Sequence, residues 1–475
     1  MTLKNKVING LKWSILAKFA VQVFSWVSTF LIIRILSPED YGIVAIASLV
    51  FDLVSIFALN GFISALVKTQ NINVKSASQV FTFSLSVYIL FSLLLAFFAS
   101  HIASFYNNEF VENALYFMAV ITPLNSLRIV PNAILNVKMD FKTKALCEFV
   151  SSLATTLVAL IGAYQGLGFW CLLYANAVGL VIRVIMLNYV ASAKYGVTSD
   201  FIGAKKTFIF AGKIQLNGLV WFAYNKLDTL IVGKFLGLVQ LGIYQVAVDV
   251  ASTPMSKVST IINQVGFSAF SSLEENMSAC QYYLQKAFRL VSLAIFPIFV
   301  GISNISLEVC TLILGEKWLA AAPIISIIAL VFPFRMLNIV LGSFLNAIDQ
   351  AGSSLINTSI ISVILISSIL IGVQFGLKGT AMGWLFGFVF AINIIFLRMH
   401  YKHKIELSTL YCWIWPAMPS AIMWFGLNYL SRIAISADIS LLALLAIKVV
   451  CGGVFIAITY LLFFSKDIKV LLKKT

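Results

Sequence analysis

Polar side chains recur every three or four residues within several strongly apolar stretches of this sequence. Two such series are Ser14, Lys18, Gln22, Ser25 and Thr29, and Gln245, Asp249, Ser252 and Ser256. Residues at this spacing share one face of a helix. Charge is costly in hydrocarbon, so these faces must point at protein or water. The pattern predicts helices with a polar interior, which is typical of proteins that move a polar solute.

The charged and amide residues on these faces are the candidate binding residues. Candidates for holding a ligand are Lys18, Arg128, Arg335, Arg183, Lys226, Lys257, Gln22 and Asn125. Candidates for coupling to an ion gradient, or alternatively structural counter-ions, are Asp52, Asp228 and Asp249. Cations outnumber anions within the apolar stretches, and this surplus predicts an anionic ligand such as phosphate or pyrophosphate. Arginine matches phosphate geometry with two hydrogen bonds.

Other cations in apolar stretches have a simpler interpretation. Arg34 and Lys234 lie near the ends of predicted spans, where long side chains reach the interface. Lys448 lies in one of the last spans, and we expect it to face lipid headgroups or a groove for a lipid tail.

Signatures of catalysis and of cofactors are missing from the sequence. There is no GxxxxGK[ST] phosphate loop and no CxxC pair, and three histidines offer no evident Ser/His/Asp set. His400 and His403 form only an HxxH pair in a basic turn. The sequence therefore predicts no enzyme, no metal site and no cofactor.

Composition identifies a membrane protein. Hydrophobic residues make up 61% of the 475 residues, charged residues only 11%, and the mean hydropathy is +0.99. A span needs about 20 apolar residues. We predict an all-α polytopic fold with about fourteen transmembrane helices at 11–36, 41–67, 77–100, 110–135, 146–165, 167–191, 211–236, 240–270, 286–304, 319–346, 354–375, 377–399, 411–431 and 439–464.

The distribution of lysine and arginine gives the expected orientation. The net charge of +15 is concentrated in alternate connections and in both termini, so the positive-inside rule places both termini in the cytoplasm. This topology accounts for the charge, and no nucleic-acid partner is expected.

The chain repeats itself at a nearly constant offset. Leu160-Ile161-Gly162 recurs as Leu370-Ile371-Gly372, and Gly166-Leu167 recurs as Gly376-Leu377. Parallel repeats of six spans predict two pseudo-twofold-related six-helix lobes around a central polar cavity. The expected domains are an N-terminal lobe (1–191), a cytoplasmic linker (192–213), a C-terminal lobe (211–404), and two further spans with a basic tail (405–475).

Several motifs carry a family resemblance. They are Tyr224-Asn225-Lys226-Leu227-Asp228, Gly315-Glu316-Lys317-Trp318, Arg335 with Gly342-Ser343, and the opening Lys12-Trp13-Ser14. Together and in this order they resemble Wzx-type polysaccharide flippases of the colanic-acid exporter branch. The likeness covers most of the chain and is weakest in the last two spans.

The resemblance implies membership of the multidrug/oligosaccharidyl-lipid/polysaccharide exporter superfamily. Its implied fold is two lobes that work by alternating access, and its implied location is a bacterial inner membrane. The implied cargo is an undecaprenyl-diphosphate-linked oligosaccharide, flipped to the periplasmic leaflet for lipopolysaccharide or exopolysaccharide synthesis. A polysaccharide polymerase and a chain-length regulator are possible partners, and the last two spans would help to form a lipid-tail groove.

Two other functions remain open from the sequence. An ion-coupled multidrug antiporter of the same superfamily would need an acidic cavity for cationic drugs. A membrane-embedded polysaccharide polymerase or ligase would need a substantial periplasmic loop, whereas the longest external connection predicted here is about 305–318.

Overall fold

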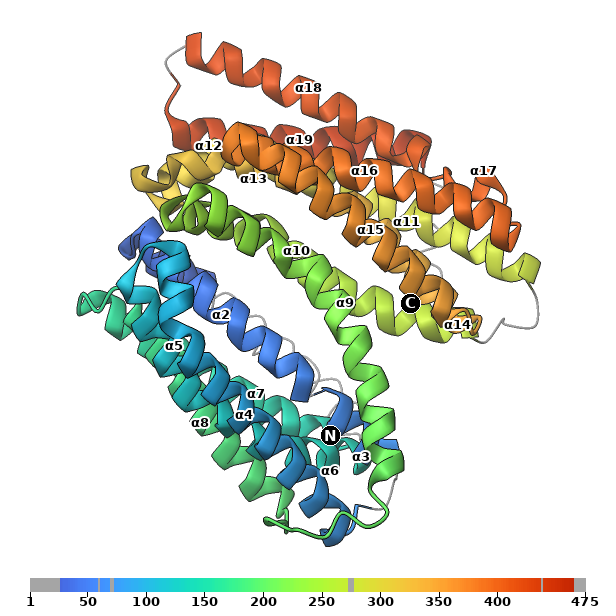
Figure 1. The fold of residues 1–475 in the computed structure, drawn as a ribbon. Coiled ribbons are helices and arrows are strands. Elements are labelled where there is room, and N and C mark those ends of the chain that lie inside the picture. Colours follow the sequence, from blue (N-terminus) through green and yellow to red (C-terminus); the bar gives the residue numbers. More distant parts are fainter. Residues whose placement is uncertain (1–25, 59, 69–71, 272–276, 437–438, 465–475) are drawn as a thin grey trace, which may run out of the picture. The chain divides into compact units, whose positions relative to one another are not determined.

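The computed structural model of the chain describes residues 26–58, 60–68, 72–271, 277–436 and 439–464. Within these ranges every regular element is a helix, which confirms the prediction of an all-α protein. The chain divides into two compact units, Met1–Phe222 and Ala223–Thr475 (Figure 1). The division falls inside α9 (Lys205–Leu236), so one continuous helix belongs to both units.

The first unit is built from a short helix over Trp26–Ile35 and from a series of longer ones. Its elements are α2 (Pro38–Ala58), α3 (Asn60–Lys68), α4 (Val74–Tyr106), α5 (Glu109–Ile121), the 3-10 helix η1 (Thr122–Arg128), α6 (Ile129–Val137), α7 (Phe141–Tyr164) and α8 (Trp170–Ala191). A non-helical connector then leads to α9, which begins at Lys205 and not at the predicted position 211.

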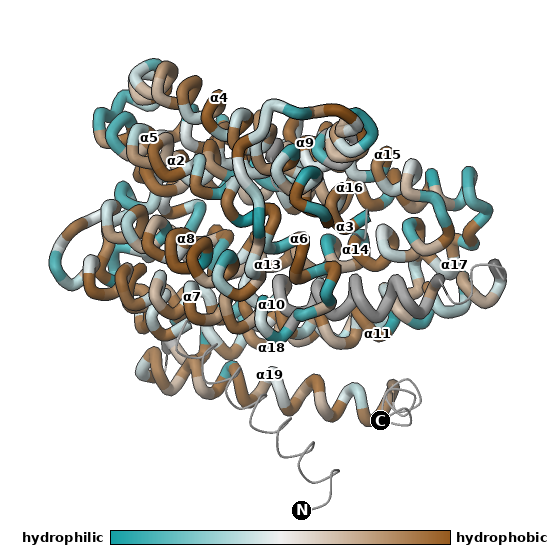
Figure 2. The backbone as a smooth tube through the Cα atoms, turned by 90° about the horizontal axis from the view of Figure 1, so that it is seen from below, coloured by the Kyte–Doolittle hydropathy of each residue, from teal (hydrophilic) through white to brown (hydrophobic). Residues whose placement is uncertain are grey.

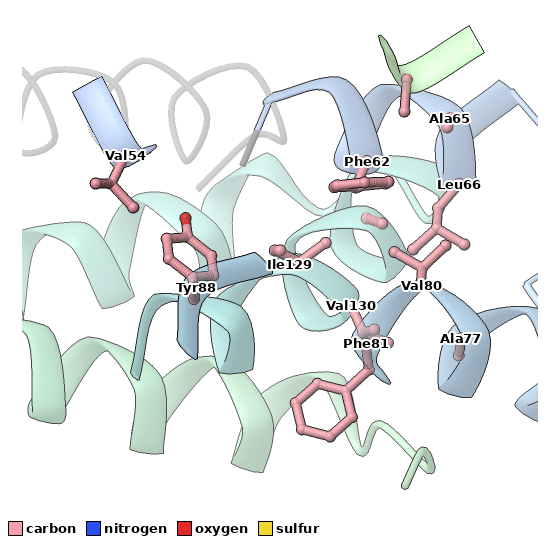
Figure 3. Close-up of a cluster of buried hydrophobic side chains, with 12 residues drawn as sticks. Val54, Phe62, Ala65, Leu66, Ala77, Val80, Phe81, Tyr88, Ile129 and Val130 are labelled. Carbon is pink, nitrogen blue, oxygen red and sulfur yellow. The ribbon is translucent and has the colours of Figure 1, made fainter. Parts of the chain in front are cut away.

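A hydrophobic cluster holds α2, α3, α4 and α6 together (Figure 3). Val54, Phe62, Tyr88 and Ile129 are each at most 2% exposed and come from these four helices. The start of α9 packs on the same cluster at Gly61, where an added Cβ would lie 2.5 Å from the Ala211 carbonyl oxygen. Glycine therefore permits this close contact between helices.

The connector is tied along the first turns of α4. The Lys75 ammonium lies 2.7 Å from the Asp200 carboxylate, and the Gln79 side chain donates to the Asp200 carbonyl at 2.8 Å. The Thr198 amide donates to the Thr82 hydroxyl at 2.9 Å. The connector thus belongs to the first unit.

The second unit contains the remaining helices. Its elements are α10 (Leu238–Ser271), α11 (Met277–Asn304), α12 (Ser306–Glu308), the π-helical turn η2 (Val309–Leu314), the 3-10 helix η3 (Glu316–Ala321), α13 (Ala322–Ala329), α14 (Phe332–Ala347), α15 (Ala351–Gly372), the 3-10 turn η4 (Val373–Phe375), α16 (Gly376–His403), α17 (Leu407–Leu410), α18 (Ile414–Ser436) and α19 (Leu441–Phe463). The stretch 305–318, expected to be an external connection, is therefore largely helical, and the fully buried Trp318 anchors it.

Eight helical segments of the described chain are long and apolar enough to cross a membrane. They are Val74–Tyr106, Glu109–Val137, Lys142–Tyr164, Trp170–Ala191, Ser278–Asn304, Glu316–Ala347, Ala351–His403 and Leu441–Phe463. Hydrophobic residues run along most of the helices in Figure 2. This confirms a polytopic membrane protein, while the count of fourteen spans stays a prediction.

The two units share local features at the repeat spacing found in the sequence. The predicted span 110–135 changes to a 3-10 helix at Pro123, and the predicted span 319–346 is interrupted just before Pro333, 210 residues later. Gly166 and Gly376, also 210 residues apart, both have a φ of 74° in the turn before a long helix. These matching turns support the internal repeat.

Candidate substrate-binding cavity

A cavity of about 410 Å³ lies within the first unit. Its walls come from α2, α5, η1, α7 and α8. The lining residues are Ser48, Phe51, Asp52, Met118, Ile121, Arg128, Glu148, Ser151, Ser152, Thr155, Thr156, Asn176, Gly179, Leu180 and Arg183. Three predicted site residues, Asp52, Arg128 and Arg183, therefore line one cavity.

Arg128 reaches the cavity because α5 does not continue as a regular α-helix. Pro123 lies in the first turn of η1, and in the tighter 3-10 turn the Arg128 guanidinium donates to the Asn125 side-chain oxygen, three residues earlier, at 2.9 Å. Asn125 is 1% exposed, so it supports Arg128 from inside the protein. The Nε of Arg128 is buried and has no hydrogen bond within the described chain.

Arg183 on α8 is held by a carboxylate across the cavity. Its guanidinium lies 2.5 Å from Glu148 on α7. The Glu148 side chain is 46% exposed and the Arg183 side chain 27%, so the pair is open to solvent. The predicted ligand set contained Arg183 but not Glu148.

The face of α7 that lines the cavity carries hydroxyl groups. Ser151, Thr155 and Thr156 each donate a hydrogen bond to a backbone carbonyl three or four residues earlier, at 2.9 to 3.0 Å. Their oxygen lone pairs remain available as acceptors. This wall went unnoticed in the sequence, although Glu148, Ser151 and Thr155 have the same spacing as the stripes that predicted the other polar faces.

The charges that line this cavity are balanced. Two arginines face two carboxylates, Asp52 and Glu148. Arg183 pairs with Glu148, whereas Arg128 donates to a neutral amide. Chemically, the cavity offers one cation suited to an anionic group, and several acceptors suited to a hydroxylated ligand.

In the second unit, Arg335 lies in an aromatic cage. Its guanidinium carbon is 5.0 Å from the ring centre of Tyr224, 5.4 Å from that of Trp384 and 5.6 Å from that of Phe332. Cations are attracted to aromatic faces at such distances. The guanidinium also donates to the Asn225 side-chain oxygen at 2.7 Å.

Asp228 shares a void of about 30 Å³ with Arg335 and Asn225. The Tyr244 hydroxyl donates to its carboxylate at 2.6 Å, and the Thr229 amide donates at 2.8 Å. Asp228 is 6% exposed. The carboxylate is thus fixed by neutral donors inside the second unit.

The remaining predicted residues are more scattered. Asp249 is exposed on α10 and accepts from Gln245 at 2.9 Å. Lys226 is half-buried on α9. The side chain of Lys257 and all of Lys18 and Gln22 lie outside the described residues.

Lys448 has a protein partner that sequence reasoning missed. Its ammonium contacts the Glu308 carboxylate inside the second unit, so it does not face headgroups. Lys448 therefore does not contribute to the expected surplus of cations. Across the described chain, no group of three or more His, Cys, Asp or Glu side chains could hold a metal ion.

An apolar groove of about 570 Å³ lies in the second unit. It is lined by Phe296 and Val300 of α11, Leu330, Pro333 and Phe334 at α14, Leu385, Phe386 and Val389 of α16, and Trp413 to Phe425 at and along α18. Trp413 stacks on Phe296 with ring centres 5.3 Å apart. The groove suits a hydrocarbon chain and offers almost no polar group.

A family model described as polysaccharide biosynthesis protein matches residues 31–323, more than half of the chain. The chain belongs to this family. Membership confirms the resemblance to polysaccharide flippases drawn from the sequence motifs. Membership also agrees with the prediction that this chain is a transport protein and not an enzyme.

Named relatives span most of the chain. Teichuronic acid biosynthesis protein TuaB of Bacillus subtilis is 24% identical over 420 residues, covering 86% of this chain and 84% of its own. Lipopolysaccharide biosynthesis protein WzxC of Escherichia coli is 21% identical over 397 residues, covering 81% and 79%. Both names refer to a biosynthesis pathway, one of teichuronic acid and the other of lipopolysaccharide.

The fold has a solved counterpart. Lipid II flippase MurJ, in an inward closed conformation, superposes with a TM-score of 0.74 at 15% identity. The match covers 94% of this chain and 99% of that one. At this identity the likeness establishes the fold.

Proposed function

We propose that this protein translocates an undecaprenyl-diphosphate-linked oligosaccharide from the cytoplasmic to the periplasmic leaflet of a bacterial inner membrane. Two lobes would alternate in opening to either side, with both termini in the cytoplasm. Family membership and the flippase fold support this assignment. The product would then pass to a polysaccharide polymerase and its chain-length regulator.

The observation that carries the proposal is Arg128 at the wall of a hydroxyl-lined cavity within apolar helices. Its Nη1 donates to a neutral amide and its buried Nε donates to nothing within the described chain, so the cation can hold an anionic group. A diphosphate would take this position. The hydroxyls of α7 and the carboxylates of Asp52 and Glu148 would accept hydrogen bonds from sugar hydroxyls.

The apolar groove of the second unit supports the same cargo. An isoprenoid tail is a hydrocarbon chain that must stay out of water while its headgroup crosses. The groove walls are aromatic and aliphatic, and they include α18, from the region that the sequence placed outside the repeat. The groove would take the isoprenoid tail of the lipid.

The experiment is complementation with an Arg128 series. The chain is expressed in strains that each lack one polysaccharide flippase, and the surface polysaccharide that returns is measured. A charge-assisted contact to phosphate contributes about 1.5–3 kcal/mol, so Arg128→Ala should lower export by about tenfold or more. Arg128→Lys keeps the charge but loses the two-bond geometry and should restore export only in part.

The matched control is Arg432→Ala, which removes an exposed arginine from α18 and should export like the wild type at equal membrane abundance. Wild-type export by Arg128→Ala would refute the role of this arginine. Failure of the wild type to restore any polysaccharide would count against the function itself.

A multidrug antiporter is the second candidate, because Asp52 and Glu148 place two carboxylates in the same cavity. Such a protein would raise resistance to cationic drugs in a sensitive strain. We expect unchanged drug sensitivity, since Glu148 is already paired with Arg183.

A further inference from the structure

A buried ion pair joins the C-terminal helices to the rest of the second unit. Lys448 of α19 contacts Glu308 of α12, and the two residues are 5% and 1% exposed. Lys448 also donates to the Asn304 carbonyl at 2.8 Å. The Asn428 amide of α18 donates to the Asn304 side-chain oxygen at 2.9 Å. Both α18 and α19 are therefore tied to the last residue of α11.

The same cluster bonds to the backbone of the apolar groove. The Asn304 amide donates to the Val300 carbonyl at 3.0 Å, and the Asn428 amide donates to the Trp424 carbonyl at 2.8 Å. Val300 and Trp424 line the groove from α11 and α18, one helical turn away from the asparagines. The separation of α11 and α18 at the cluster therefore sets the separation of two groove walls.

An ion pair fixes this separation more strictly than apolar packing would. An apolar helix can slide along an apolar neighbour at little cost, and the outer faces of α18 and α19 are exposed and apolar. A buried Lys or Glu that loses its partner becomes an uncompensated charge in a low-dielectric medium. At the other end of these helices, the Tyr460 hydroxyl donates to the Leu293 carbonyl at 2.6 Å, a contact between two neutral groups.

We propose that Glu308 and Lys448 are positioning residues that hold α18 at the distance from α11 that admits an isoprenoid tail. Neither residue lines the groove, so they act through Asn304 and Asn428 and not by touching the tail. The inference rests on the proposed function, in which this groove receives the tail.

The test measures groove geometry and tail binding separately. Spin labels are attached to cysteines replacing Ile298 on α11 and Phe425 on α18, which are 44% and 68% exposed, in a background without native cysteines. Their distance distribution is measured by pulsed electron resonance in liposomes. Tail binding is measured by photolabelling with a diazirine-bearing undecaprenyl phosphate. The variants are Glu308→Gln, Lys448→Met, and the exchanged pair Glu308→Lys with Lys448→Glu, with Arg432→Met as control.

We expect a narrow distance distribution in the wild type and in the control. Each single variant should give a broader or shifted distribution, with photolabelling lower by about tenfold. The exchanged pair should recover both, because it restores opposite charges in contact. Recovery separates positioning from general loss of folding.

Three results would overturn the proposal. Unchanged distances and labelling in both single variants would overturn the positioning role, as would an exchanged pair that folds yet stays broadened. If the wild type shows a narrow distribution but no photolabelling, the groove does not receive the tail. That result would overturn the proposal as a claim about tail binding, while the headgroup test with Arg128 would still stand on its own.

Discussion

At the residue scale, the two arginines that line the cavity of the first unit have different partners. One donates to a neutral amide, and the other pairs with a carboxylate. Arg128 bonds to Asn125, and Arg183 bonds to Glu148. We therefore assign them different roles. Arg128 is available for an anionic headgroup, whereas Arg183 shapes the cavity by crossing from α8 to α7.

The energy source for transport concerns three acidic residues. We propose that transport draws on an ion gradient, the membrane potential or the cargo gradient. Asp228 is the most enclosed of the three acidic candidates and is held by the Tyr244 hydroxyl. Asp52 lines the polar cavity, and Asp249 is exposed.

We predict that Asp→Asn at the coupling residue will lower export and remove its sensitivity to ionophores, because a neutral amide cannot carry the coupled charge. The three single variants, Asp52→Asn, Asp228→Asn and Asp249→Asn, are compared at equal abundance. Tyr244→Phe is the control for Asp228, since it removes the hydrogen bond and keeps the carboxylate. Full activity in all three variants, with ionophore insensitivity of the wild type, would leave only transport driven by the cargo.

The sequence predicted part of the site because the spacing of polar residues along a helix shows which of them share one face. The periodicity of polar residues indicated Asn125, Arg128 and Asp52 as interior-facing positions, and in the structure Asn125 is buried while Arg128 and Asp52 line the cavity of the first unit. It could not indicate that Lys448 pairs with Glu308, because that contact joins elements 140 residues apart in the chain. The aromatic cage of Arg335 was missed for the same reason, since its rings come from three different helices.

At the element scale, the cavity depends on how closely α7 and α8 approach. Gly179 of α8 faces Thr155 of α7, and an added Cβ would lie 1.9 Å from the Thr155 hydroxyl oxygen. No other residue fits without displacing a side chain that lines the cavity. The glycine therefore sets the spacing of two cavity walls.

We predict that Gly179→Ala will destabilise the protein by about 1–3 kcal/mol and lower export, because overpacking forces the two helices apart. Gly453→Ala on α19 is the control, since an added Cβ there meets nothing within 4 Å. That control should be neutral or stabilise by about 0.5–1 kcal/mol, as alanine favours a helix more than glycine does. The melting temperature of each variant is measured by heating the protein in detergent. Equal melting temperatures for Gly179→Ala and the wild type would contradict the packing argument.

An exposed ion pair helps to attach the connector to α4. The hydrogen bond from Lys75 lowers the pKa of the exposed Asp200 below its ordinary value. The pair therefore stabilises the attached connector above the ordinary aspartate pKa, and this contribution is lost as the pH falls through the lowered pKa. The effect should be small because both side chains are about half exposed.

Hydrogen exchange of residues 193–204 measures this attachment. We expect faster exchange in Asp200→Asn than in the wild type at neutral pH, after correction for intrinsic rates, and convergence of the two proteins at acidic pH. Identical protection at every pH would show that the backbone and hydroxyl contacts hold the connector without the ion pair.

The fold was more predictable than the site. Apolar length and the positive-inside pattern indicated a polytopic helical protein, and the repeat offset of 210 residues reappears in the turns at Gly166 and Gly376. Interruptions within predicted spans were not foreseen, because Pro123 and Pro333 stand inside stretches whose hydropathy is continuous. Hydropathy measures the length of a span and is insensitive to the local hydrogen-bonding pattern.

At the scale of the whole molecule, each unit offers a different chemical surface. The first holds a cavity of hydroxyls, carboxylates and arginines, and the second holds an apolar groove. A lipid-linked oligosaccharide has the same division between a polar, charged head and a hydrocarbon tail. The proposed alternating access would require similar binding of the headgroup in both states, since a large difference in affinity would trap the cargo in one of them.

Translocation in proteoliposomes tests the central claim most directly. Undecaprenyl-diphosphate-linked repeat units from a complemented strain are incorporated with the purified protein, and a membrane-impermeant oxidant of sugar diols reports the fraction that reaches the outer leaflet. We predict that the wild type exposes lipid from both leaflets within the assay, whereas empty liposomes expose about half, and Arg128→Ala is slower by about tenfold. Exposure equal to that of empty liposomes, from a preparation that is folded and correctly inserted, would contradict the account.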